Sequence, residues 1–220
     1  MKKGIIFDLD GTLWDSSEEV VDSWLIALED YPEMQSVITR DSIQAIMGKT
    51  TGEIEDILFA SLPKKERKQV LAHCLQVENE YIEKHGGKLF EGLEETLEVL
   101  KKDYHLYIVS NCQVGYIEAF LKHHGLGEYF EDFESHGGTG KSKGENICLV
   151  VERNKLEKAV YVGDTQGDYE ATMFAGLPFV HVKKGFGKVN GEVACIEKLS
   201  ELVEVVDRIM EGKLLIQSEK

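Results

Sequence analysis

Long apolar runs and paired cysteines are both missing from this 220-residue chain. No stretch approaches the roughly 18 uninterrupted apolar residues of a membrane-spanning helix, and the few residues before the first apolar run leave no room for a signal peptide. The four cysteines are widely spaced and form no Cys-x-x-Cys pair, which disfavours a disulfide framework and a zinc site. We therefore expect a cytoplasmic protein with reduced thiols and no membrane partner.

Basic residues are also scarce. The chain has 25 Lys and Arg against 40 Asp and Glu, which gives a formal net charge of -15. A surface of this sign repels nucleic acid, so we expect no nucleic-acid partner. The remaining composition, with 42% hydrophobic and 30% charged residues, is that of an ordinary globular protein.

The most informative stretch is residues 4–13, an apolar run that ends at Asp8, Asp10, Gly11 and Thr12. Such a run predicts a buried strand, and the carboxyl ends of strands in an open parallel sheet are where ligands bind. Alternation along a strand sends Asp8 and Asp10 to the same side, so their negative charges need a cation nearby. A hard, oxygen-seeking ion such as Mg2+ fits this requirement.

Residues 16–87 predict only helices. Ser16 and Glu19 match a capping box for the first of them, which should run to about residue 30. The next strand-like stretch is 105–110, although a crossover between parallel strands needs only a dozen or so residues besides its helix. We therefore expect a helical cap domain at 16–87, inserted into a core of 1–15 and 88–220 and able to cover the acidic site. Its hinges should lie near 13–16 and 86–89.

From Gly92 onward, helical and strand-like segments alternate. This pattern predicts an α/β fold, with a Rossmann-like core in which a parallel sheet lies between two layers of helices. The predicted strands after the first are 105–110, 132–133, 159–162 and 179–182. The predicted helices between and after them are 94–102, 114–123, 143–154, 164–175 and 199–210.

Polar residues follow two further strands of this predicted sheet. Ser110-Asn111 ends one, and Asp164 ends another, with Asp168 four residues later on the same face of the next helix. Lys143 supplies a cation near a predicted helix start, where backbone N–H groups also attract anions. Lys141 is a rival for this role, but a capping box of Ser142 and Glu145 favours Lys143.

These motifs, in this order, resemble the haloacid dehalogenase superfamily. The relevant stretches are DLDGTLWDS at 8–16, Ser110-Asn111, Lys143-Gly144 and GDTQGD at 163–168. Within that superfamily the chain looks like the phosphoglycolate-phosphatase-like and beta-phosphoglucomutase-like branch, which carries a helical cap after the first strand. One departure is Gly144, since the family usually has Lys-Pro at this motif.

The resemblance implies a separate role for each of the acidic residues. Asp8 would be the nucleophile that forms an aspartyl-phosphate, and Asp10 the general acid and then the general base. Mg2+ would be held by the Asp8 carboxylate, the Asp10 backbone carbonyl and Asp164, with Asp168 in support. Because dehalogenation releases halide and needs no acid at Asp10, this residue favours phosphoryl transfer.

The resemblance also implies the groups that hold substrate. Ser110, Lys143 and the backbone amide of Asn111 would bind the phosphoryl oxygens, and Thr12 would orient the Asp10 loop. Lys49, in the predicted cap, is a candidate substrate contact. Cys112 lies beside the Ser110 motif but has no part in this mechanism.

The predicted activity is Mg2+-dependent hydrolysis of a small phosphorylated metabolite, such as phosphoglycolate, a sugar phosphate or a nucleotide monophosphate. One alternative is a sugar-phosphate mutase of the beta-phosphoglucomutase type, and a second is a catalytically silent protein that binds a phosphorylated ligand. A third comes from residues 135–142, which miss a Walker A loop only at Ser135 and would indicate an ATPase or kinase. That loop, however, does not follow the first strand and would leave Asp8 and Asp10 unexplained. Oligomeric state is left open.

Overall fold

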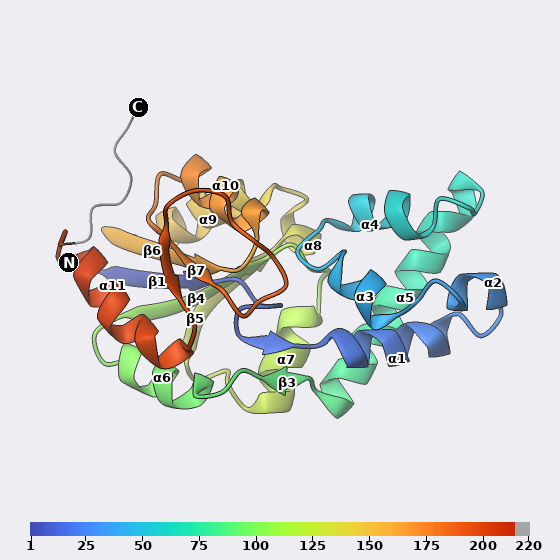
Figure 1. Ribbon diagram of the computed structural model, residues 1–220, viewed down its shortest axis with the longest axis horizontal. Helices are drawn as coiled ribbons and strands as arrows, with labels where there is room; N and C mark the ends of the chain where they lie inside the picture. The colour runs from blue at the N-terminus through green and yellow to red at the C-terminus, as the bar shows by residue number, and fades with distance from the viewer. Residues whose placement is uncertain (214–220) are drawn as a thin grey trace.

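A six-stranded parallel sheet forms the centre of the computed structural model, which describes residues 1–213 (Figure 1). The strand order is β5-β4-β1-β6-β7-β8, and every neighbouring pair is parallel. The bounds are β1 Lys3–Phe7, β4 His105–Ser110, β5 Phe130–Ser135, β6 Lys158–Gly163, β7 Phe179–Val182 and β8 Ala194–Ile196. Phe7 of β1 pairs with Ile108 of β4 on one side and with Val162 of β6 on the other, so the carboxyl ends of β4, β1 and β6 lie side by side.

Helices cover both faces of this sheet, as the alternation of β1 side chains requires. Ile5 and Phe7 belong to the hydrophobic core shared with α6, α7 and α11, whereas Ile6 belongs to the core shared with α9 and α10. The bounds are α6 Leu93–Leu100, α7 Tyr116–His124, α8 His136–Thr139, α9 Lys143–Arg153, α10 Gln166–Phe174, a 3-10 turn Leu199–Glu201 and α11 Leu202–Met210. The predicted three-layer α/β fold is confirmed.

Residues 16–87 form a helical segment that lies beside the sheet in Figure 1 and is called the helical insert below. Its helices are α1 Ser17–Ala27, α2 Pro32–Gln35, α3 Arg40–Gln44, α4 Thr51–Leu58 and α5 Lys64–His85. Both α1 and α4 pack on the long α5, which in turn packs on α7 of the sheet layer. The indole of Trp24 is buried within this insert and lies against Phe59.

Two segments connect the sheet to the helical insert, and they pair with each other in a short antiparallel ladder that was not predicted from the sequence. It pairs β2 (Trp14–Asp15) with β3 (Lys88–Leu89). The Trp14 ring is buried and makes edge contacts with Tyr116 and Phe120 of α7, with ring centroids 5.9 and 4.8 Å apart. Both strands of the connection are therefore anchored to each other and to the sheet layer at the predicted hinges.

Several local predictions need correction. The Ser16 capping box is wrong, because the Ser16 hydroxyl bonds to Asp10 and Tyr116 and makes no cap hydrogen bond. The strand expected at 132–133 extends over 130–135, and β8 and α2 were not predicted. The capping box of Ser142 and Glu145 is confirmed. Within residues 1–213, no helix has the length and apolar character needed to cross a membrane.

Candidate active site

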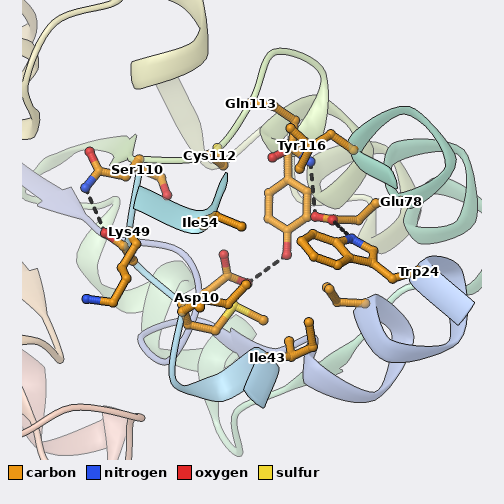
Figure 2. A pocket seen from close by; sticks show the side chains of 16 residues that line it. Asp10, Trp24, Ile43, Lys49, Ile54, Glu78, Ser110, Cys112, Gln113 and Tyr116 are labelled. Atoms are coloured by element: carbon orange, nitrogen blue, oxygen red, sulfur yellow. Dashed lines mark hydrogen bonds between the residues drawn. The ribbon is translucent and has the colours of Figure 1, made fainter. Parts of the chain in front are cut away.

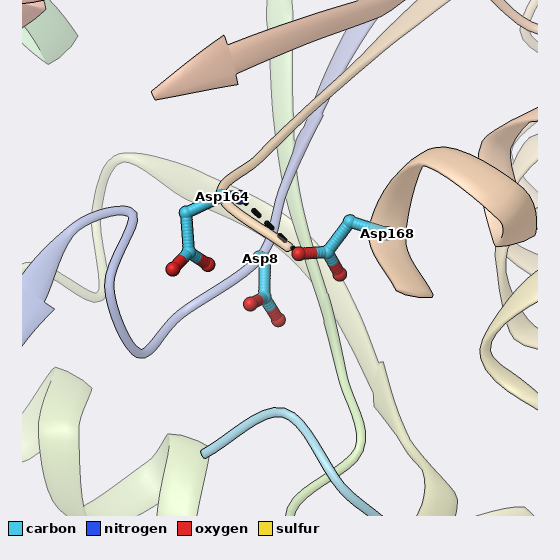
Figure 3. A group of neighbouring side chains, drawn as sticks. All are labelled: Asp8, Asp164 and Asp168. Carbon is cyan, nitrogen blue, oxygen red and sulfur yellow. Dashed lines mark hydrogen bonds between the residues drawn. The ribbon is translucent and has the colours of Figure 1, made fainter. Parts of the chain in front are cut away.

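Three carboxylates from separate segments meet at the carboxyl edge of the sheet (Figure 3). Asp8 follows β1, Asp164 follows β6 and Asp168 lies in the first turn of α10. One oxygen from each carboxylate lies within 4.8 Å of the others, and the three residues are 1%, 0% and 0% exposed. Because β1 and β6 are neighbours in parallel register, their ends bring Asp8 and Asp164 together.

Lys143, the first residue of α9, provides the cation at this cluster. Its Nζ donates to Asp8 Oδ1 at 2.8 Å and to Asp168 Oδ1 at 2.5 Å, and the side chain is 5% exposed. Burial opposes the charged ammonium, but the Asp168 and Asp8 carboxylates outweigh that effect and hold the pKa of Lys143 well above its ordinary value. Lys141 is exposed, so the structure brings Lys143 rather than Lys141 to Asp8.

One ammonium does not balance three buried carboxylates. Burial and the neighbouring charge of Asp168 raise the pKa of Asp8, although Lys143 opposes this shift. Burial and the charges of Asp168 and Asp8 also raise the pKa of Asp164. The cluster therefore favours a further positive charge or a bound proton.

The donor set fits a hard divalent cation. Asp164 Oδ2 accepts hydrogen bonds from the backbone amides of Phe186, at 2.7 Å, and Gly187, at 3.1 Å. Asp164 Oδ1 is buried and has no hydrogen-bond partner among the described residues. An unpartnered carboxylate oxygen beside two more carboxylates offers the oxygen ligands that Mg2+ prefers.

A glycine allows the Asp10 turn to approach Asp164. Gly11 has φ +76°, and a Cβ built there would lie 2.4 Å from Asp164 Oδ2. Gly140 has a similar φ of +68° but nothing within 4 Å of its Cβ position, which makes it a matched control. The left-handed conformation alone should cost Gly140→Ala about 1–2 kcal/mol.

Gly11→Ala should lower the free energy of unfolding by roughly 1–3 kcal/mol more than Gly140→Ala, because its methyl group must displace Asp164. Chemical denaturation of both variants measures the difference. Equal losses in the two variants would mean that the turn is free to move away from Asp164.

Asp10 lies outside the carboxylate cluster and has its own hydrogen-bond network. Its Oδ1 accepts from Ser16 Oγ at 2.7 Å and from the Tyr116 hydroxyl at 2.8 Å, and these two hydroxyls are 2.9 Å apart. Burial raises the pKa of Asp10 above its ordinary value, although both hydrogen bonds oppose the shift. Burial therefore favours the protonated form of Asp10, whereas the two hydrogen bonds hold the carboxyl group in place and stabilise its charged form.

A cavity of about 50 Å³ opens next to Asp10, between the sheet layer and the helical insert (Figure 2). Ser110 and Asn111 line it from the end of β4, and Gly48 and Lys49 line it from the insert. Asn111 Nδ2 donates to the carbonyl of Gly48 at 2.8 Å, which ties the two parts together across the cavity. The structure thus gathers Asp10, Ser110, Asn111 and Lys49 at one opening.

Thr12 was predicted to have a role at the site, whereas Cys112 was not. Thr12 is fully buried, and its hydroxyl has no partner among residues 1–213. Cys112 also lines the cavity, and burial raises the pKa of its thiol well above the ordinary value. The protonated thiol is a poor nucleophile, in keeping with the absence of a predicted role.

Sequence reasoning missed Tyr116, Glu78 and Gln113, which also line the cavity. Glu78 carried a detectable signal, because it stands four residues from both Cys74 and Ile82 on the buried stripe of α5. A carboxylate on an apolar stripe is rare unless its polar atoms are satisfied. No local sequence pattern indicated Tyr116, because it contacts Asp10 across 106 residues of sequence.

This geometry accords with the sequence comparisons. A profile described as haloacid dehalogenase-like hydrolase matches residues 5–182. The chain belongs to the haloacid dehalogenase-like hydrolase family. The matched region begins in β1 and ends with β7, so it includes all three clustered carboxylates and Lys143.

Relatives named as phosphatases match nearly the full length of the chain. Pyrophosphatase PpaX from Listeria welshimeri is 27% identical over 220 residues, covering 92% of this chain and 95% of PpaX. A phosphoglycolate phosphatase from Aquifex aeolicus is 27% identical over 216 residues, covering 92% of this chain and 96% of that protein.

Solved structures share the same fold. One from Bacteroides fragilis, named as a haloacid dehalogenase-like hydrolase, has a TM-score of 0.79 and 25% identity, covering 92% of this chain and 100% of that one. CbbY from Rhodobacter sphaeroides, solved with phosphate, has a TM-score of 0.75 and 17% identity, covering 94% and 100%. The likeness to CbbY concerns the fold alone.

Proposed function

We propose that the protein is a Mg2+-dependent phosphatase that hydrolyses a small phosphomonoester through an aspartyl-phosphate on Asp8. The observation that carries this proposal is the buried Lys143 ammonium, bonded to both Asp8 and Asp168 beside the unpartnered Asp164 oxygen. The names of the relatives, a pyrophosphatase and a phosphoglycolate phosphatase, support the same class of reaction.

The first half of the reaction transfers the phosphoryl group to Asp8. A carboxylate oxygen of Asp8 attacks phosphorus in line, and the bond from phosphorus to the alcohol oxygen breaks. That oxygen takes the proton of the Asp10 carboxyl, and the raised pKa of Asp10 supports this general-acid role. Ser110, the Asn111 amide and Lys143 would bind the phosphoryl oxygens, and Thr12 would position the Asp10 turn.

The second half returns Asp8 to its starting state. Asp10, now a carboxylate, takes a proton from water as the water oxygen attacks phosphorus. The bond from phosphorus to the Asp8 oxygen breaks, and inorganic phosphate leaves. Ser16 and Tyr116 hold the Asp10 carboxylate for both steps through the hydrogen bonds at its Oδ1.

Asp8, Asp164, the Asp10 backbone carbonyl and, in support, Asp168 are the proposed Mg2+ ligands. Bound Mg2+ supplies positive charge that offsets repulsion between the substrate phosphate and the Asp8 carboxylate. The helical insert would act as a cap domain over residues 16–87, with residues 1–15 and 88–220 as the core. The bond between Asn111 and Gly48 supports this role, because it closes the insert over the site.

Metal removal tests the proposal directly. Phosphate release from a panel of phosphomonoesters should fall by about 100-fold or more when a chelator removes Mg2+, and it should return when Mg2+ is added in excess. The panel includes p-nitrophenyl phosphate as a general reporter. Metal-independent release would contradict the proposed ligand set, and release from no ester at all would contradict a phosphatase function.

A further inference from the structure

The far wall of the cavity carries a buried carboxyl group that the proposed chemistry does not use. Glu78, on α5 of the helical insert, is 5% exposed and lines the cavity with Trp24 and Gln113 (Figure 2). Glu78 Oε1 accepts from Gln113 Nε2 at 3.0 Å, and Oε2 accepts from the indole N–H of Trp24. These two bonds fix the carboxyl group in place on the insert side.

The donors near Glu78 are already engaged. Gln113 Nε2 also donates to Asn79 Oδ1 at 3.0 Å, so both of its N–H groups have acceptors. The Tyr116 hydroxyl donates to Asp10. In the ionised form of Glu78, by contrast, each carboxylate oxygen accepts one bond and has capacity for a second. This end of the cavity therefore offers acceptors to a ligand rather than donors.

The charge of Glu78 also disfavours an anionic ligand at this end of the cavity. Burial raises the pKa of Glu78 to about 7, and the charge of Asp10 adds to this effect, while the Gln113 and Trp24 bonds oppose it. A carboxylate or phosphate on a ligand placed here would either meet a negative charge or force proton uptake. Lys49 is a cation at the cavity, but its amine points away from Glu78 in Figure 2. Hydrogen bonds from Thr50 lower the pKa of the exposed Glu53 carboxylate, and the positive charge of Lys49 adds a smaller effect in the same direction.

The cavity is also small and mostly apolar. A volume of about 50 Å³ holds only a few water-sized groups, at roughly 10–15 Å³ each. The apolar wall consists of Val20, Trp24, Ile43, Ile46, Met47, Ile54 and Leu75.

Building on the proposed function, we propose that this cavity receives the leaving alcohol of the substrate, and that Glu78 selects a small neutral or cationic alcohol bearing further hydroxyl or amine donors. A glycerol-like polyol or an amino alcohol has this chemistry. Phosphoglycolate and pyrophosphate do not, because their leaving groups bring a second anion and no donor. The proposed substrate class therefore differs from the substrates in the relatives' names.

The test compares kcat/KM for glycerol phosphate and ethanolamine phosphate with kcat/KM for phosphoglycolate and pyrophosphate. The native enzyme should prefer the first pair by at least about 10-fold, the ratio that corresponds to 1.4 kcal/mol. Glu78→Gln removes the charge while keeping an acceptor for Trp24, and it should narrow this ratio by about 10-fold, mainly by improving the anionic substrates. Glu80→Gln, the same change at an exposed position of α5, should leave the ratio unchanged.

Other outcomes are decisive against the inference. Equal or better turnover of phosphoglycolate by the native enzyme would overturn it while leaving the phosphatase proposal intact, and so would an unchanged ratio in Glu78→Gln. If no ester is hydrolysed, including p-nitrophenyl phosphate, the phosphatase proposal fails separately. Calorimetric binding of the same four compounds to Asp8→Asn with Mg2+ then measures the preference without turnover, and tighter binding of phosphoglycolate and pyrophosphate would overturn the role of Glu78.

Discussion

Asp8→Asn should abolish phosphate release, with a loss of roughly 10^4-fold or more, the scale seen when a nucleophile is removed from an enzyme. The amide nitrogen and oxygen cannot replace a carboxylate that attacks phosphorus and then leaves again as a carboxylate. The change keeps the size of the side chain, and the amide oxygen can still accept from Lys143. Initial rates of phosphate release with saturating Mg2+ and p-nitrophenyl phosphate measure the effect.

The matched control is Asp103→Asn, which makes the same change on an exposed turn before β4 and should leave the rate unchanged. Thermal denaturation without Mg2+ provides the second readout. Asp8→Asn should not lower the melting temperature, because it removes one of three crowded carboxylates. A folded Asp8→Asn protein that still releases phosphate at a tenth of the native rate would exclude Asp8 as nucleophile.

The sheet and the ends of its middle strands could be predicted because they depend on local sequence. An apolar run followed by polar residues identifies β1, β4 and β6 one at a time, and parallel topology then brings their ends together. Asp8, Asp164 and Ser110 were located by this argument. Lys143 followed from a capping box, which is equally local.

The surroundings of Asp10 could not be predicted in this way. Ser16 matched a helix cap in sequence, but in the structure the hydroxyl of Tyr116, from α7, lies 2.9 Å from its Oγ and both bond to Asp10. The pairing of Glu78 with Gln113 joins α5 to the loop after β4. Such contacts depend on how the helical insert packs against the sheet layer, and periodicity within either segment carries no information about that packing.

Lys143→Met should impair both stability and activity, and it separates the role of Lys143 from that of Lys141. Removing one partner of a buried ion pair leaves the other charges uncompensated, at a cost of about 3–5 kcal/mol. Here Asp8 and Asp168 both lose their ammonium partner. We therefore expect a loss of this size in the free energy of unfolding without Mg2+. The exposed Lys141→Met should change it by only about 0.5 kcal/mol.

Addition of Mg2+ distinguishes the electrostatic explanation from simple loss of packing. A cation that binds only the folded state stabilises it by an amount that rises with the cation concentration relative to its dissociation constant, so Mg2+ should recover part of the stability lost in Lys143→Met. It should not recover activity, because the substrate phosphate still lacks its lysine. Combining Lys143→Met with Asp8→Asn should cost less stability than the sum of the two changes, since the double variant carries one fewer unpaired carboxylate. Additive losses would show that Lys143 stabilises the fold through its hydrocarbon stem, and that the three carboxylates do not share its charge.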